Sequence, residues 1–203
     1  MRPIETLKNA SGKSSTGGTP SFTPAHVLIA LERIGLGKGI GRQQLSRRLR
    51  LGEGMMRTLV RRLKTLDLIE TSRGGMRLTP VGESLLNELN GVIKAADFPP
   101  TLITVGVANF AVLVMGAASK VKRGIEERDA AIMVGAQGAT SLVMQDGRLR
   151  MPGMDETFDA EIERIIHERM ELFEGDVLII GSSDDPFLAE IGAKSAALML
   201  LES

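Results

Sequence analysis

Two adjacent prolines, Pro99 and Pro100, stand near the middle of this 203-residue chain and most strongly limit how it can fold. Proline lacks the backbone N–H, and its ring clashes with a preceding helical turn, so the pair stops a helix and favours an extended connection. A chain of this length can form two small domains, each with its own core. We therefore predict two folded units that join near residues 97–100.

The distribution of charge supports this division. The whole chain carries 25 Lys/Arg and 25 Asp/Glu, and its net charge of zero taken alone argues against a nucleic-acid partner. Residues 1–100, however, hold 16 basic and 8 acidic side chains, whereas residues 101–203 hold 9 and 17. The halves thus differ in the sign of their net charge, which predicts different partners for them.

Composition excludes several classes of protein. The chain has no cysteine, which excludes disulfides and thiolate metal sites and fits a reducing compartment. Its apolar runs are much shorter than the roughly 20 residues that a membrane-spanning helix needs. We predict a cytoplasmic protein with no membrane partner, no metal and no cofactor.

The glycine-rich segments of the basic half are predicted to be connections. Residues 1–21 are predicted to be a flexible tail, because residues 9–20 lack apolar periodicity. Gly12-Lys13-Ser14 resembles part of a phosphate loop, but Leu7 stands where that motif requires a glycine. In residues 35–41 every second residue is glycine. This segment follows a predicted helix rather than a strand, which favours a flexible connector over a dinucleotide site.

The rest of the basic half predicts four helices and a two-stranded hairpin. Thr23-Pro24 and Thr79-Pro80 each pair an N-cap residue with a proline at the first helical position. Between them, residues 42–65 predict two helices separated by a turn at Arg50-Leu51-Gly52. The remaining predicted elements are a helix ending at Gly35, strands 68–71 and 76–78 around a glycine turn, and a helix ending near Asn90.

The second helix of residues 42–65 has two different faces. Its apolar stripe, Met56, Val60, Leu63 and Leu66, is predicted to be buried, as Leu45 and Leu49 are in the preceding helix. The opposite face carries long polar or flexible side chains: Met55, Arg57, Thr58, Arg61 and Arg62. A helix that reads DNA needs this combination of a packed stripe and an exposed basic face.

This order of elements over residues 22–92 resembles a winged helix-turn-helix. The segments that carry the resemblance are residues 40–49, 51–63, 68–71 and 78–82. The whole chain resembles an archaeal two-domain family of transcription regulators, in which a winged helix, here residues 22–96, precedes an α/β domain of unknown function, here residues 101–203. The resemblance implies an α+β or α/β fold and double-stranded DNA as the partner.

The predicted DNA-binding residues fall into three groups. Arg57 and Arg61 lie one turn apart and are suited to guanine, while Met55 and Thr58 are suited to the thymine methyl group. Gly54 allows close approach of a phosphate at the helix N-terminus. The predicted backbone contacts come from Arg42, Arg47, Arg48, Arg50, Arg73 and Arg77, with Arg73 at the wing tip also placed to enter a minor groove. Arg62 is predicted to contact DNA from the exposed face of the helix. The alternatives are a solvated helix face, an RNA partner, and a winged helix that contacts proteins only.

The acidic half predicts a sandwich of mixed strands and helices with undetermined sheet order. Asp146-Gly147 is a hairpin turn signal, and Asp185-Pro186 marks the start of the last helix. The predicted strands are 102–107, 110–115, 140–145, 148–151 and 177–180, and the predicted helices are 126–134, 159–172 and 186–200. The last helix, rich in alanine and leucine, is predicted to be core, although its small residues would also permit packing between subunits.

Two loops of the acidic half are candidates for a ligand site, because loops that follow buried strands commonly bind ligands in α/β proteins. The candidate residues are Arg128, Asp129, Gly135, Gly138, Gly181, Ser182, Ser183 and Asp184. The competing interpretation is that these glycines are helix stops and that Asp185 is only an N-cap.

No residue is predicted to be catalytic. His167-Glu168 lacks the second histidine of a zinc-protease helix, and no serine lies in a Gly-x-Ser-x-Gly elbow. The sequence therefore predicts a homodimeric transcription regulator whose acidic domain senses a small-molecule effector or forms the dimer. The alternatives are a small-molecule enzyme fused to a winged helix and a protein-interaction scaffold.

Overall fold

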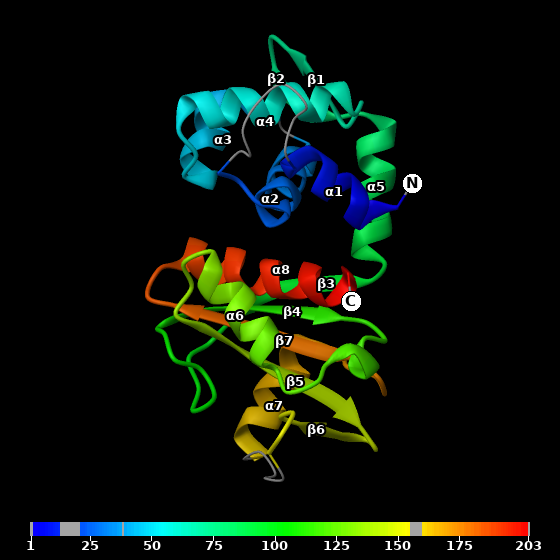
Figure 1. Cartoon of the computed structure of the whole chain (residues 1–203), viewed down its shortest axis with the longest axis vertical. Coiled ribbons are helices and arrows are strands. Elements are labelled where there is room, and N and C mark those ends of the chain that lie inside the picture. Colours follow the sequence, from blue (N-terminus) through cyan, green and yellow to red (C-terminus); the bar gives the residue numbers. More distant parts are fainter. Residues whose placement is uncertain (1, 13–20, 38, 155–159, 203) are drawn as a thin grey trace. The chain divides into compact units, whose positions relative to one another are not determined.

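The computed structural model describes residues 2–12, 21–37, 39–154 and 160–202 (Figure 1). The chain divides into two compact units, with the boundary between Gly91 and Val92. This boundary precedes the predicted one at residues 97–100, because strand β3 (Ile93–Phe98) pairs with a strand of the second unit. Residues 92–96, which the sequence assigned to the first domain, therefore belong to the second.

The N-terminal unit contains the helices and the hairpin that the sequence predicts. Its elements are α1 (Pro3–Ser11), α2 (Pro24–Gly35), α3 (Arg42–Leu49), α4 (Glu53–Thr65), β1 (Ile69–Ser72), β2 (Gly75–Leu78) and α5 (Pro80–Asn90). The predicted caps are present. The Thr79 hydroxyl accepts from the Gly82 N–H at 3.1 Å, and the Thr23 N–H donates to His26 Nδ1 at 3.1 Å. Burial lowers the pKa of His26 to about 4, so this ring is neutral near pH 7.

Helix α1 corrects the prediction of a flexible tail over residues 1–21. Its Leu7 and Ala10 side chains are fully buried, and the helix packs on α2, α4 and α5. The Arg62 guanidinium closes its C-terminal end by donating to the carbonyl oxygens of Ala10 at 2.9 Å and Gly12 at 2.6 Å. Tertiary contacts thus stabilise this nine-residue helix, which is too short to be stable alone. Residues 13–20 of the predicted tail lie outside the described residues.

The buried stripe of α4 differs slightly from the predicted one. Met56, Leu59 and Leu63 are fully buried, whereas Val60 and Leu66 are only half-buried. The spacing of three and then four residues follows the helical period, so Leu59 rather than Val60 completes the inward face. Leu45 and Leu49 of α3 are buried as predicted.

The segment before α3 is attached to the hairpin and is not a free connector. Ile40 forms a β-bridge with Met76, with N···O distances of 2.9 and 3.3 Å in the two directions. A Cβ on Gly39 would lie 2.1 Å from the Gly74 carbonyl oxygen, and Gly39 has φ +67. Glycine is therefore required here for close backbone approach.

The C-terminal unit is a five-stranded sheet with helices on both faces. Its elements are β3, β4 (Ala108–Val114), the 3-10 turn η1 (Ala118–Lys120), α6 (Ile125–Met133), β5 (Gly138–Gln145), β6 (Arg148–Arg150), α7 (Ala160–Arg169), β7 (Val177–Ser183) and α8 (Pro186–Glu202). The strand order is β3-β4-β7-β5-β6, and every neighbouring pair is antiparallel. Helices α6 and α8 cover one face and α7 covers the other (Figure 1).

The core under α7 follows from the alternation of side chains along the strands. Ile162 and Ile166 of α7 pack on Leu142, Leu178 and other apolar residues of this face. The hairpin turn at Asp146-Gly147 is present, with φ values of 54 and 69. The Glu174 carboxylate accepts from the Gly147 and Asp146 N–H groups, and these bonds lower its pKa.

Two predicted features of this unit are wrong. Residues 102–107 form no strand, because β3 and β7 already occupy the two edges of β4. Strand β7 extends through Gly181, Ser182 and Ser183, which the sequence placed in a loop. The fold is thus α+β with an antiparallel sheet, so the expectation that loops after its buried strands bind a ligand, which holds for α/β proteins, does not apply to it.

Candidate nucleic-acid interface

A tight turn sets the angle between α3 and α4. Arg50 adopts a left-handed conformation with φ 52, and the Leu51 N–H donates to the Ser46 carbonyl at 3.1 Å. The Ser46 hydroxyl donates back to the Leu51 carbonyl at 2.6 Å. With the inner stripes of both helices buried, this turn fixes which face of α4 remains exposed.

The exposed face of α4 is basic, as predicted. The side chains of Arg57 and Arg61 lie at the surface, and that of Arg57 is 69% exposed. Glu53 accepts ion pairs from Arg42 and Arg57, each with an N···O distance of 3.4 Å. The other predicted phosphate-contacting residues that are exposed are Arg47, Arg48, Arg73 and Arg77. Exposed guanidinium groups at this spacing can bind phosphates or the edge of guanine.

The first turn of α4 is open to a partner. A Cβ on Gly54 would have no heavy atom within 4 Å, so packing within the protein does not require glycine there. The Thr58 hydroxyl donates to the Gly54 carbonyl at 3.1 Å, which uses the polar end of Thr58. Met55 is half-buried, and its Cε lies 3.8 Å from the Cβ position of Gly52. The DNA contacts of Gly54 and Thr58 stay predictions, whereas the Met55 side chain folds back toward the helix start.

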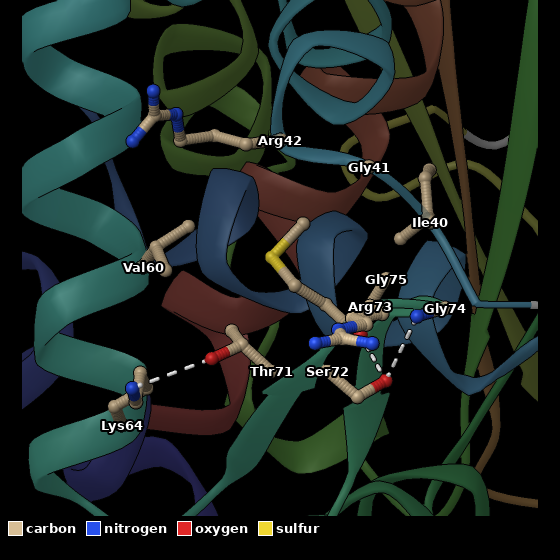
Figure 2. A pocket seen from close by; sticks show the side chains of 11 residues that line it. Ile40, Gly41, Arg42, Val60, Lys64, Thr71, Ser72, Arg73, Gly74 and Gly75 are labelled. Carbon is tan, nitrogen blue, oxygen red and sulfur yellow. Dashed lines mark hydrogen bonds between the residues drawn. The ribbon is translucent and has the colours of Figure 1, made fainter.

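A groove of about 610 Å³ separates α4 from the hairpin (Figure 2). Arg42 and Lys64 lie at its two ends along the helix side, and Arg73 comes from the hairpin between them. Lys64 also donates to the Thr71 hydroxyl at 3.4 Å. Sequence reasoning missed Lys64, although its place three residues after Arg61 puts it on the same side of the helix.

Arg62 was predicted to contact DNA, and its geometry corrects that assignment. Its guanidinium bonds the end of α1 and lies 5.8 Å from the centre of the Phe22 ring. Both bonds come from Nη1, so the two protons of this nitrogen are not available to phosphates. Arg62 is therefore a residue that stabilises the fold.

The structure brings together some of the predicted ligand residues. Gly138 of β5 is the register partner of Ser182 of β7, and the Gln137 amide donates to Asp184 Oδ2 at 2.7 Å. Asp185 is confirmed as the N-cap of α8, since its carboxylate accepts from the Phe187 N–H at 2.9 Å.

The remaining predicted ligand residues have other surroundings. Arg128 and Asp129 form an exposed ion pair on α6, which covers the opposite face from α7. Gly135, with φ +99, follows the end of α6 and packs against Leu188. Gly181 lies within β7 against α8, where a Cβ would be 2.5 Å from the Ala189 carbonyl. Among the residues the structure describes, no three His, Asp or Glu side chains are placed to hold a metal ion.

The helix-turn-helix with its two-stranded wing defines the N-terminal unit as a winged helix, here followed by an α+β domain. Residues 28–93 match the family described as the CggR N-terminal DNA binding domain, and residues 105–201 match a domain of unknown function, DUF4443. The predicted resemblance to a two-domain regulator with a C-terminal domain of unknown function is confirmed by this pair of matches.

One solved structure is similar to nearly the whole chain. It is the hypothetical protein PH0730 from the archaeon Pyrococcus horikoshii OT3, with 29% sequence identity and a TM-score of 0.72. The similarity covers 90% of this chain and 94% of that one. A comparison with curated proteins found no match. Among the described residues, no helix has the length and apolar character needed to cross a bilayer.

Proposed function

We propose that this protein is a transcription regulator that binds double-stranded DNA through its N-terminal unit and acts by binding rather than by catalysis. The observation that carries the proposal is the exposed basic face of α4 beside the wing, with Arg57 and Arg61 one turn apart. The match of residues 28–93 to a DNA-binding domain supports the same conclusion.

In this proposal, α4 enters the major groove and its arginines contact base edges. Arg42, Lys64 and Arg73 line the protein groove between α4 and the hairpin. They would bind the DNA phosphates on either side of the major groove. The open N-terminus of α4 at Gly52 to Gly54 adds backbone N–H groups suited to a phosphate. Arg47 and Arg48 would fix the register on the duplex.

The test is the affinity for duplex DNA at several salt concentrations. We expect the logarithm of the association constant to fall linearly with that of salt, by about 0.9 for each phosphate contact. Arg57→Ala combined with Arg61→Ala should weaken binding to a selected site by about 1–3 kcal/mol per arginine.

The matched control for this test is Arg164→Ala on α7. Arg164 is an exposed helical arginine paired with a glutamate four residues away, as Arg57 is, but it lies in the acidic unit. It should leave DNA binding unchanged. Equal losses for the two arginine sites, or an affinity without salt dependence, would contradict the proposal.

We further propose that the protein acts as a homodimer, because helix-turn-helix dimers contact half-sites one DNA turn apart. Light scattering coupled to size exclusion should give twice the mass of the 203-residue chain at micromolar concentration. A monomer both with and without DNA would contradict this part of the proposal.

A further inference from the structure

Helix α6 exposes the kind of residue that a surface helix normally buries. It packs on α8 and β5, and its buried residues are Glu127 and Ala131 (Figure 1). Its larger apolar side chains lie at the surface instead: Ile125 is 38% exposed, Ile132 is 47% exposed and Met133 is 86% exposed. A helix that packed only within its own domain would turn these side chains inward. The outer face of α6 therefore has the character of an interaction surface.

Four exposed residues form one stripe along this outer face. They are Ile125, Arg128, Asp129 and Ile132. Their positions follow the first by three, four and seven residues, the spacing that places side chains on the same side of a helix. The side chain of Arg128 is 51% exposed and that of Asp129 is 56% exposed. The stripe thus has an apolar side chain at each end and two opposite charges at its centre.

This stripe is complementary to a second copy of itself in the antiparallel orientation. A twofold axis that passes midway between Arg128 and Asp129 places Arg128 of each helix opposite Asp129 of the other. The same axis places Ile125 of each helix opposite Ile132 of the other. A parallel twofold pair would instead bring each charge against the same charge, which is repulsive. The charges therefore select the antiparallel orientation and its register.

The two central charges are available for such an exchange. Within one chain, Nη2 and Nε of Arg128 donate to Asp129 Oδ1 at 3.0 and 3.2 Å. An ion pair exposed on both sides contributes little to stability and exchanges readily with other charges. Each charge can therefore bind its opposite in a second copy without the loss of a buried contact.

Met133 lies beside the stripe and extends the apolar contact. In the antiparallel pair it lies opposite Gly124 of the second copy, which has no side chain to obstruct it. Since α6 is nine residues long, a contact centred on it is small for a protein interface. We expect an association that reverses on dilution.

We propose that the homodimer forms through α6, with a second copy of this chain packed antiparallel across the stripe of Ile125, Arg128, Asp129 and Ile132. This interface rests on the homodimer of the proposed function and says where that dimer forms. The isoleucines supply the apolar contact, and the two crossed ion pairs fix the register. Arg128 and Asp129, which the sequence assigned to a ligand site, then bind the second copy.

The experiment is sedimentation velocity of the full chain over a range of concentrations. The unaltered protein should convert from monomer to dimer as its concentration rises. Arg128→Asp and Asp129→Arg each place like charges opposite one another in the pair, so each variant should associate at least tenfold more weakly. Ile132→Ser should have a similar effect because it removes apolar contact. All three positions are exposed, so the variants should fold, which circular dichroism checks.

A mixture of the two charge variants tests the pairing itself. In a mixed dimer the new carboxylate at position 128 faces the new guanidinium at position 129, and the remaining Asp129 faces the remaining Arg128. The mixture should therefore regain the association that each variant alone has lost. A substitution that only disturbed α6 within its own chain would not be rescued in this way.

The matched control is Arg164→Asp on α7, which reverses the charge of another exposed arginine that pairs with a carboxylate of its own helix. It should leave the association unchanged. Equal weakening by Arg164→Asp would overturn the proposal, and so would a mixture of the two charge variants that stays monomeric.

Two further outcomes separate this interface from the proposed function. If the charge variants dimerise as the unaltered protein does, the interface through α6 is wrong and the homodimer stands. If the unaltered protein binds DNA but stays monomeric at every concentration, the interface and the dimer are both wrong, and the proposed DNA binding stands. Dimers with the expected variant effects but without DNA affinity would support the interface and contradict the proposed function.

Discussion

In the N-terminal unit, Glu53 pairs with Arg42 and Arg57 at the surface with N···O distances of 3.4 Å, whereas in the C-terminal unit Lys194 and Glu190 form a buried pair at 2.7 Å. Exposed pairs contribute little to stability and exchange readily with other ions. A buried pair is held because separating it leaves a charge away from water. The cations of the Glu53 pairs thus stay accessible to a partner, whereas the cation of Lys194 helps to hold the fold of the second unit.

The largest expected effect tests the buried pair. Lys194→Met should lower the free energy of unfolding by about 3–5 kcal/mol, because Glu190 stays buried without this partner. Chemical denaturation monitored by circular dichroism measures the change. The control is Arg164→Ala, which removes an exposed pair of the same i,i+4 spacing and should cost less than about 0.5 kcal/mol. Similar costs for the two variants would remove the distinction between the units.

The second prediction compares two neighbouring arginines of α4. Arg62→Ala should destabilise the protein by about 2–3 kcal/mol, since it removes two charge-assisted bonds to the end of α1. Arg61→Ala should leave stability within about 0.5 kcal/mol and weaken DNA binding by about 1–3 kcal/mol. Denaturation measures the change in stability of each variant, and DNA titration measures the change in its affinity. The assignment fails if Arg62→Ala is stable and loses DNA affinity as Arg61→Ala does.

The third prediction concerns pH. The pKa of His26 is about 4 in the folded protein, below its ordinary value of 6.5. As the pH falls, the unfolded chain therefore binds a proton at this residue before the folded protein does. The contribution of His26 to the free energy of unfolding is full above about pH 6.5 and is lost as the pH falls toward 4. We expect a loss of up to about 2 kcal/mol between pH 7 and pH 5 from this group.

Replacement by glutamine isolates the contribution of His26. His26→Gln keeps an acceptor at the third helical position, where glutamine completes a capping box, and it removes the titration. The difference in stability between pH 7 and pH 5 should shrink in this variant when urea denaturation is followed at both values. An unchanged difference would assign the pH dependence to other groups.

The smallest expected effect concerns Glu53. Glu53→Gln should raise the affinity for random duplex DNA about two- to threefold. In the unaltered protein, Arg42 and Arg57 must give up their ion pairs with Glu53 to bind phosphates, and the variant removes this cost. Stability should change by less than about 0.5 kcal/mol. Fluorescence anisotropy at low salt can resolve the change. A weaker affinity would instead indicate that Glu53 itself contacts the DNA.

Sequence reasoning succeeded where a local signal specifies the backbone. The caps at Thr23, Thr79 and Asp185 and the hairpin at Asp146-Gly147 each depend on residues within three or four positions, and all are present. The two faces of α4 followed from the helical period with one shift, from Val60 to Leu59. Arg57 and Arg61 are exposed as this pattern predicts, whereas Arg62 is half-buried, and their contact with DNA stays a prediction.

The failures concern features that distant contacts decide. Arg62, more than 50 positions away in the chain, bonds the C-terminal end of helix α1. The local signals of this helix, Pro3 at its start and Leu7 and Ala10 at helical spacing, were not used in the prediction. Residues 102–107 alternate like a strand, yet both edges of β4 are taken by β3 and β7. Strand β3 contains Lys94, Ala95 and Ala96, which have low strand propensity, and it forms because β4 offers an edge.

The strand order of the C-terminal sheet has a consequence for synthesis of the protein. Its central strand, β7, is the last strand to leave the ribosome, and it pairs with both β4 and β5. Until residue 183 emerges, those two strands have unpaired edges, whereas every element of the N-terminal unit is already complete at residue 91. We expect the winged helix to fold during translation and the sheet to close late, with its open edges exposed to aggregation in the interval.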